Sequence, residues 1–188
     1  MRRLILITLL ALCVNSAWAQ SWFGLNLEKD SLNSVKKILE KDGVDFEISN
    51  IEGDKDMPVI YAKNFKRANM RNQIGYVTLR FLAVQTKEGK TEPLLSRITV
   101  EHDDPKLVLF EHLVSKFEQL GYDKRQPNQY EVHFQDASLE FRVGVFNRAQ
   151  SGATVLTVIS QNLFSGEMMI ESSIKDAKAT EFVKSLLG

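Results

Sequence analysis

The chain has a single cysteine among its 188 residues, and its 24 basic side chains are balanced by 24 acidic ones. With one thiol it forms no internal disulfide and no zinc site built from several cysteines. The balanced charge leaves no overall basic field that would collect nucleic acid or an anionic membrane surface. Stability must therefore come from a hydrophobic core, which a chain of this length is able to bury.

Long apolar runs are also missing after the first twenty residues. At the N-terminus, two arginines precede residues 4–14, an apolar run too short to cross a bilayer as a helix. Ala17 and Ala19 then supply the small side chains that signal peptidase selects. We therefore expect residues 1–19 to be a secretion signal that is cleaved after Ala19. Cys13 leaves with it, and the mature protein is expected to be periplasmic or secreted.

Two stretches have the periodicity of an amphipathic helix that ends at a glycine. Residues 105–121 place their apolar side chains on one face, which is typical of a helix lying on a sheet. An aspartate at position 103 or 104 is suited to cap that helix. A fainter helix is predicted over residues 30–43. Gly121 and Gly43 end the two helices, because glycine adopts the left-handed conformation without a Cβ clash.

The segments that follow each helix alternate apolar and polar residues, which predicts half-buried strands. Short turns in the second half favour an antiparallel meander. A short strand is also expected at residues 167–171, a closing helix at 174–187, and a strand or extended lead-in at 23–27. The main predicted strands are residues 44–49, 58–62, 74–85 and 96–102, then 130–135, 139–147 and 154–160.

These elements predict an α+β protein with two helix-then-antiparallel-β-meander repeats. The helices are expected to pack on one face of the sheet, with a further helix at the C-terminus. We expect the first repeat to span residues 20–103 and the second, with the closing helix, residues 104–188. The two helix ends share Glu, Gly and Asp over seven aligned residues, but the order of elements is the stronger indication. The sequence leaves open whether the repeats share one sheet.

Residues 23–43 and 105–121, each with the strands that follow, resemble a known type of exported protein. A helix that ends in glycine before an antiparallel meander is similar to the repeat unit of the outer-membrane assembly factor BamE (SmpA/OmlA). Its tandem form resembles the β-lactamase-inhibitor-protein-like fold. The resemblance implies a domain that binds other proteins and catalyses no reaction. The tethering cysteine typical of BamE lipoproteins has no counterpart here.

No constellation of residues predicts catalysis or metal binding. His102 stands beside two aspartates that suit a cation, but a strand end followed by a helix cap explains the same residues. His112 is predicted on the solvent side of its helix and His133 on the exposed side of its strand. Nucleophile elbows, phosphate-binding glycine loops and the H-E-x-x-H motif are absent from the sequence. We therefore expect no enzymatic activity, no cofactor and no metal.

The sheet face opposite the helices is the predicted binding surface, because tyrosine and arginine are enriched at protein-binding hot spots. A solvated face with cross-strand ion pairs is the competing interpretation. A cationic loop is a second candidate contact, or simply a mobile loop. The candidates on the face are Tyr76, Arg80, Arg97, Arg142 and His133, and those in the loop are Lys66, Arg67 and Arg71.

From these patterns we expect a non-catalytic protein-binding module of the cell envelope. Its partner is expected to be another envelope protein, and it is expected to bind no nucleic acid and to have no transmembrane segment in the mature chain. The alternative is a carrier of a small apolar ligand or lipid in a cavity between helix and sheet. The residues predicted to line such a cavity are Phe134, Phe141, Phe146, Phe164, Met168 and Met169.

Overall fold

A computed structural model describes residues 21–51, 57–70, 75–85, 89–135, 141–148 and 150–163. The predicted α+β class is confirmed, and none of the described helices is long and apolar enough to cross a membrane. The first half runs α2 (Leu32–Lys41), β1 (Asp45–Asn50), β2 (Pro58–Lys63), the 3-10 helix η2 (Lys66–Ala68), β3 (Tyr76–Gln85) and β4 (Thr91–Asp103). The second runs α3 (Val108–Gln119), β5 (Asp123–Asn128), β6 (Glu131–Gln135), β7 (Phe141–Arg148) and β8 (Ala153–Ser160).

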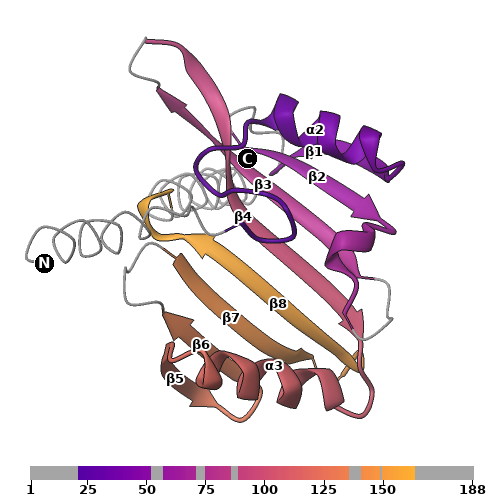
Figure 1. The fold of residues 1–188 in the computed structure, drawn as a ribbon, viewed down its shortest axis with the longest axis vertical. Helices are drawn as coiled ribbons and strands as arrows, with labels where there is room; N and C mark the ends of the chain where they lie inside the picture. Colours follow the sequence, from indigo (N-terminus) through magenta and orange to yellow (C-terminus); the bar gives the residue numbers. More distant parts are fainter. Residues whose placement is uncertain are drawn as a thin grey trace, which may run out of the picture.

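The eight strands form one antiparallel sheet in the order β1-β2-β3-β4-β8-β7-β6-β5 (Figure 1). Strands β1 to β4 are neighbours in chain order, and so are β5 to β8. The two sets meet where β4 pairs with β8, from Arg97 opposite Ile159 to Asp103 opposite Ala153. The two halves of the chain therefore share one continuous sheet, which answers the question that the sequence left open.

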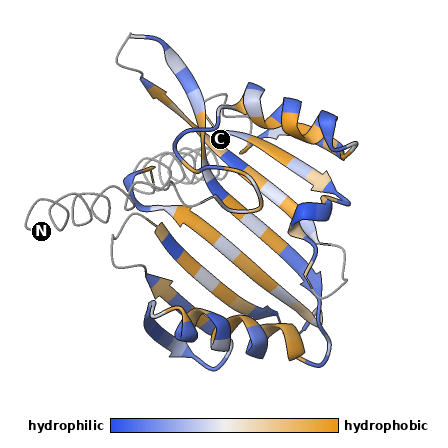
Figure 2. Cartoon of the chain, in the orientation of Figure 1, coloured by the Kyte–Doolittle hydropathy of each residue, from blue (hydrophilic) through white to orange (hydrophobic). Residues whose placement is uncertain are grey.

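Helices α2 and α3 lie on the same side of this sheet, which we call the front face (Figure 1). Figure 2 shows hydrophobic and hydrophilic residues alternating along several strands, as expected when one face packs in a core and the other does not. Val35 and Leu39 of α2 join Leu113 and Phe117 of α3 and the front-facing strand residues in one buried cluster. This cluster is the core of the molecule.

Helix α2 begins two residues later than predicted, and its end at Gly43 confirms the prediction from the sequence. The Ser31 hydroxyl accepts a hydrogen bond from the Ser34 amide at 3.3 Å, which satisfies one of the free N–H groups of the first turn. Gly43 has a φ of 64°, and the Val44 amide donates to the Leu39 carbonyl at 3.0 Å. The glycine therefore ends the helix in the left-handed conformation.

Helix α3 begins three residues later than predicted. Pro105 lies in a turn, and Leu107 precedes the helix with a φ of 58°. The cap is Asp104, whose Oδ2 accepts hydrogen bonds from the Leu109 and Phe110 amides at 2.9 Å each. The Thr154 hydroxyl donates to the same oxygen at 2.8 Å, which ties the start of α3 to β8.

The strand or extended lead-in predicted at residues 23–27 is wrong, because the segment is a turn. The Trp22 and Leu25 backbones exchange two hydrogen bonds around a tight turn in which Phe23 and Gly24 have positive φ. This segment crosses the middle of the front face between α2 and α3 (the indigo loop in Figure 1). Leu25 is fully buried there, and the Trp22 ring lies 6.2 Å from that of Phe117. The turn thus fills the gap that two widely separated helices leave in the core.

Strand β5 was not predicted, and β4 is longer than predicted. All six residues of β5 are exposed, so it has no alternation of apolar and polar side chains to reveal it. Strand β4 begins five residues before the predicted strand at 96–102, and Pro93 in this added part pairs with Ala83 of β3. The strand predicted at residues 167–171, the closing helix at 174–187 and the signal at 1–19 lie outside the described residues.

Candidate functional site

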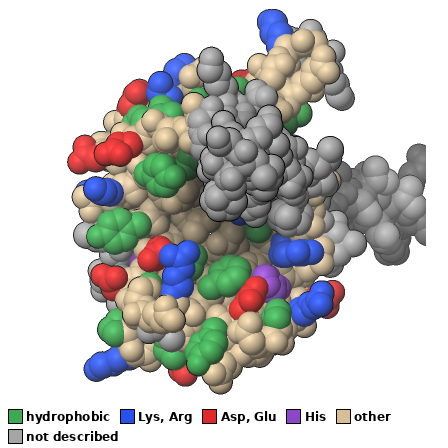
Figure 3. Space-filling model, turned by 180° about the vertical axis from the view of Figure 1, so that it is seen from behind, with side chains coloured by type: hydrophobic (Ala, Val, Ile, Leu, Met, Phe, Trp, Pro, Cys, Tyr) green, Lys and Arg blue, Asp and Glu red, His purple; other side chains and the backbone are tan. Residues whose placement is uncertain are grey.

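The face of the sheet opposite α2 and α3, which we call the rear face, is built from alternate residues of the strands. In the register of the sheet, residues directly opposite one another point to the same side. Its central row runs across six strands through Tyr61, Thr78, Thr99, Thr157, Gly144 and His133. Figure 3 shows this side of the molecule, where hydrophobic, basic and acidic side chains are interspersed.

The structure brings the five predicted face residues together. Arg80 lies opposite Arg97, and both Arg97 and Arg142 lie opposite Ile159, so the three arginines belong to one row across β3, β4, β8 and β7. Tyr76 lies opposite Glu101 on the other side of the central row and is 56% exposed. His133 belongs to the central row itself.

An open depression of about 750 Å³ occupies the middle of the rear face. Thr78, Thr99 and Thr157 form its floor, and Arg80 and Arg97 are among its lining residues. Tyr61 on β2 and Tyr130 before β6 stand toward its two ends, each about half exposed. The sequence did not identify these two tyrosines, because their place on the face depends on cross-strand register and on β5, which was missed.

Hydrogen bonds join side chains in the floor and at one rim of the depression. The hydroxyls of Thr99 and Thr157 lie 3.3 Å apart across the junction of β4 and β8. The Arg148 guanidinium donates to the Glu101 carboxylate at 2.8 Å. Both side chains of that ion pair are substantially exposed, so solvent screens their attraction and it contributes little to stability. These groups shape the surface more than they stabilise the fold.

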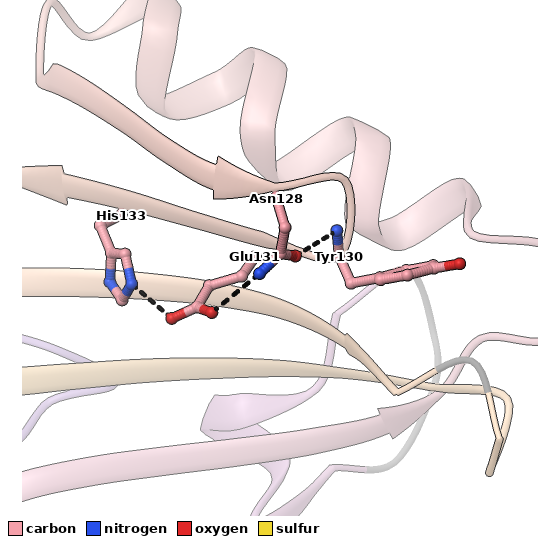
Figure 4. Close-up of polar contacts among 4 residues, drawn as sticks. All are labelled: Asn128, Tyr130, Glu131 and His133. Carbon is pink, nitrogen blue, oxygen red and sulfur yellow. Dashed lines mark hydrogen bonds and ion pairs between the residues drawn. The ribbon is translucent and has the colours of Figure 1, made fainter.

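At the β6 end, a short chain of hydrogen bonds fixes His133 (Figure 4). The Asn128 Oδ1 accepts from the Tyr130 amide at 2.8 Å, and its Nδ2 donates to Glu131 at 3.4 Å. The other carboxylate oxygen of Glu131 lies 2.5 Å from His133 Nε2. The turn between β5 and β6 therefore determines where both the carboxylate and the imidazole stand.

Gly144 allows an aromatic ring to lie across the sheet beside His133. A Cβ at this position would stand 2.5 Å from a ring carbon of Phe146, which is closer than real side chains approach. The Phe146 ring meets the imidazole edge-on, with centroids 5.7 Å apart. The His133 Nδ1 is buried over the glycine, and no residue in the described part of the chain forms a hydrogen bond with it. Because the Glu131 carboxylate can only accept, the Nε2 nitrogen is the one that carries a proton toward it.

A smaller depression of about 360 Å³ lies beside His133 at the β5 edge. Its lining includes Lys124, Arg125 and Arg142, with Asp123 as the acidic member. The Lys124 ammonium is already bound to Glu118 of α3 at 2.7 Å. This part of the surface was not predicted from the sequence, because the fully exposed β5 has no periodic signal.

The predicted cationic loop does not join the rear-face residues, and none of its described cations lines the central depression. Its first part is the 3-10 helix η2, anchored by the buried Phe65 and Ala68. The Arg67 guanidinium makes two contacts with the Asp42 carboxylate, at 2.6 and 2.9 Å. Lys66 is exposed and Arg71 lies outside the described residues. The segment is therefore an ordered part of the structure up to Ala68, with Arg67 held by an acidic partner.

His102 is on the front face and only 1% exposed, so it is part of the core. Burial lowers its pKa, while a hydrogen bond with the Ala68 backbone and the charges of Asp104 and Asp103 act in the opposite direction. The Asp104 carboxylate instead caps α3. Among the described residues, no cluster of three His, Cys, Asp or Glu side chains has the arrangement of a metal site.

The aromatic residues predicted to line a carrier cavity are divided between the two faces. Phe134 and Phe141 are buried on the front face, while Phe146 lies on the rear face over Gly144. Phe164, Met168 and Met169 lie outside the described residues. The described aromatic side chains thus do not converge on one apolar cavity between helix and sheet.

Comparison of the chain with protein-family models, with curated proteins and with solved structures gave no match. The function must therefore be inferred from the geometry and chemistry of the rear face.

Proposed function

We propose that this protein is a non-catalytic binding module of the cell envelope. Residues 1–19 act as its export signal, and it binds another protein through its rear face. The observation that carries the proposal is the gathering of Tyr76, Arg80, Arg97 and Arg142 on one side of the sheet. Tyrosine and arginine are the residues that most often dominate protein–protein binding energy, because they offer large contact area together with hydrogen bonds.

The shape and size of the central depression support a macromolecular partner. It is open and lies on a broad sheet face, whereas small-molecule sites are usually enclosed clefts lined mainly by apolar side chains. Tyr61 and Tyr130 stand apart on β2 and next to β6, so a ligand that contacts both must extend across most of the sheet. A loop or an element of a folded protein has that reach.

The chemistry of the lining supports binding over catalysis. Thr99 and Thr157 are its central hydroxyls, and they lie within hydrogen-bond distance of each other. The Nε2 nitrogen of His133 contacts the Glu131 carboxylate, and its Nδ1 nitrogen faces the sheet at Gly144. A general base has to reach the proton that it abstracts, and this imidazole offers no free nitrogen toward the centre of the depression.

We further propose that the two halves are repeats of one helix-then-four-strand unit, related to the tandem fold that the sequence resembles. The support is the strand order. From either edge of the sheet to its centre, the strands follow one another in chain order, β1 to β4 from one edge and β5 to β8 from the other. The antiparallel pairing of β4 with β8 around Thr99 and Thr157 is what a twofold relation between the halves requires.

The proposal is tested by capture from envelope extract with the chain lacking residues 1–19. The parent protein is compared with Tyr76→Ala/Arg80→Ala/Arg97→Ala, and with a control, Lys37→Ala/Glu40→Ala, on the solvent side of α2. We expect parent and control to retain one partner in stoichiometric amount, and the folded rear-face variant to lose it. Equal capture by all three proteins would contradict the assignment of the face.

A further inference from the structure

The two edges of the sheet, β1 and β5, differ in how they are protected. An edge strand presents unpaired backbone N–H and C=O groups, which act as a template for another strand. In β5 the pairing with β6 shifts between Arg125 and Asn128, and Pro127 lies in that irregular stretch. Lys124 and Arg125 add charge to the same strand. Proline, an irregular register and cationic side chains are devices that prevent strand addition.

Strand β1 lacks the proline, the irregular register and the cationic side chains, and its only charged side chains are the acidic Asp45 and Glu47. Its six residues, DFEISN, contain no proline, glycine or lysine. They pair with β2 in one unbroken register from Asp45 opposite Lys63 to Asn50 opposite Pro58. Beyond β1, no described strand continues the sheet. This edge therefore has the regular backbone that strand addition requires.

The register identifies which backbone groups of β1 point outward. The Ile51 amide donates to the Met57 carbonyl at 3.0 Å, and this pair continues the β1–β2 register. In an antiparallel ladder, pairs that exchange hydrogen bonds alternate with pairs that do not. Asp45, Glu47 and Ser49 therefore bond to β2. The N–H and C=O groups of Phe46, Ile48 and Asn50 are directed to the open edge.

The side chains of β1 add a chemical pattern to this edge. Ile48 and Phe46 lie opposite Ile60 and Ala62, so they are on the front face, and Ile48 remains 44% exposed. Asp45 and Glu47 are exposed on the rear face. Along the edge, an apolar side chain toward the front thus alternates with an acidic one toward the rear.

We propose that the β1 edge binds an extended segment of a partner protein, which adds a ninth strand to the sheet. Its apolar side chains contact Phe46 and Ile48, and its alternate lysines or arginines face Asp45 and Glu47. Backbone hydrogen bonds supply the affinity and the alternating side chains supply the selectivity. This edge site does not depend on the rear-face proposal.

The charge of β1 favours a basic segment over a second copy of this chain. If β1 paired antiparallel with the β1 of a second copy and the front faces matched, Asp45 and Glu47 of both strands would lie on the same, rear side. Like charges on neighbouring strands oppose association, whereas a basic segment is attracted by them.

The probe is a fluorescent peptide of alternating valine and lysine, titrated against the purified protein by anisotropy, with a valine–glutamate peptide for comparison. Ile48→Pro removes an outward N–H and no bond to β2, and Ile48→Thr is the matched control that keeps the N–H. We expect Ile48→Pro to weaken binding about tenfold or more and Ile48→Thr to change it less. Glu47→Lys, a surface change that tests the charge without altering the backbone, is expected to weaken binding as well.

Several results would overturn the edge site. Among them are no binding of the valine–lysine peptide, equal binding of the valine–glutamate peptide, or unchanged binding in both Ile48→Pro and Glu47→Lys. A dimer of the protein alone that Ile48→Pro dissociates, seen by analytical ultracentrifugation, would assign the edge to a second copy. Because Tyr76 and the arginines are intact in these variants, failure here leaves capture by the rear face unaffected.

Discussion

The two faces of the sheet come from the same strands but carry opposite chemistry. In β4, Ile98 and Val100 point to the front and are fully buried, while Arg97 and Thr99 point to the rear and remain partly exposed. The front is closed by α2, α3 and the turn around Leu25, and the rear holds an open depression. The front of each strand therefore determines stability, and the rear is left free to be selected for binding.

Polar residues follow the same division. His102 and Asp104 on the front are buried and bound to the backbone, so they are structural. Arg148 and Glu101 on the rear pair with each other at a solvated rim. Burying a polar group without a hydrogen bond is costly, whereas an exposed one remains accessible to a binding partner.

The largest contrast between the faces is expected from removal of an aromatic side chain. Phe134→Ala empties a fully enclosed site against Phe117, and we expect it to cost about 3–5 kcal/mol of unfolding free energy. Tyr76→Ala on the rear is expected to stay within about 0.5 kcal/mol. Urea titrations of both variants measure the difference, and similar losses would show that the rear also contributes to the core.

A second contrast in stability is expected between substitutions of the buried Asp104 and of its exposed neighbour Asp103. Asp104→Ala leaves two amides of α3 and the Thr154 hydroxyl without their acceptor, so we expect a loss of about 2 kcal/mol or more. Asp103→Ala is expected to change stability by less than about 0.5 kcal/mol. Equal effects in thermal or urea unfolding would contradict the role of Asp104 as the cap.

Gly144 tests how tightly the rear face is packed. Gly144→Ala places a Cβ against the Phe146 ring, and we expect it to cost about 1 kcal/mol. The loss should largely disappear in a Phe146→Ala background, because the ring is then absent. A double-mutant cycle by urea unfolding measures this coupling, and additive effects would refute the contact.

The smallest effect concerns pH. Burial lowers the pKa of His102 from its ordinary value of 6.5, so below that pH the unfolded chain binds a proton that the folded chain does not. Stability is therefore lost as pH falls from 6.5 toward the folded pKa, and it rises with pH over the same window. His102→Gln removes the titrating group and should flatten this slope. An unchanged slope in unfolding titrations across the window would show that His102 does not contribute.

The predictability of the fold depended on burial. Helix α2 and strands β3 and β6 were predicted because each buries mainly one side, which leaves a period in the sequence. Strand β5 buries neither side and gave no such signal. The turn at Trp22–Leu25 imitated a strand, because its apolar residues enter the core from a left-handed turn that alternation does not describe.

The candidate site shows the same limit. Alternation was enough to place Tyr76, Arg80, Arg97, Arg142 and His133 on one face, since each lies in a strand with a clear inward side. Tyr61 and Tyr130 were missed because their position relative to that face depends on which strands are neighbours. The bond between Arg67 and Asp42 joins residues far apart in sequence and has no local signature.

The most direct test of the rear face is site-specific photo-crosslinking in cells that make the protein. A photoreactive phenylalanine derivative replaces Tyr76 or Tyr61 on the rear, and His112 on the exposed side of α3 as the control. We expect a discrete adduct with one partner from both rear positions and none from position 112. An adduct only from position 112, or the same adducts from all three, would contradict the proposal that the rear face is the binding surface.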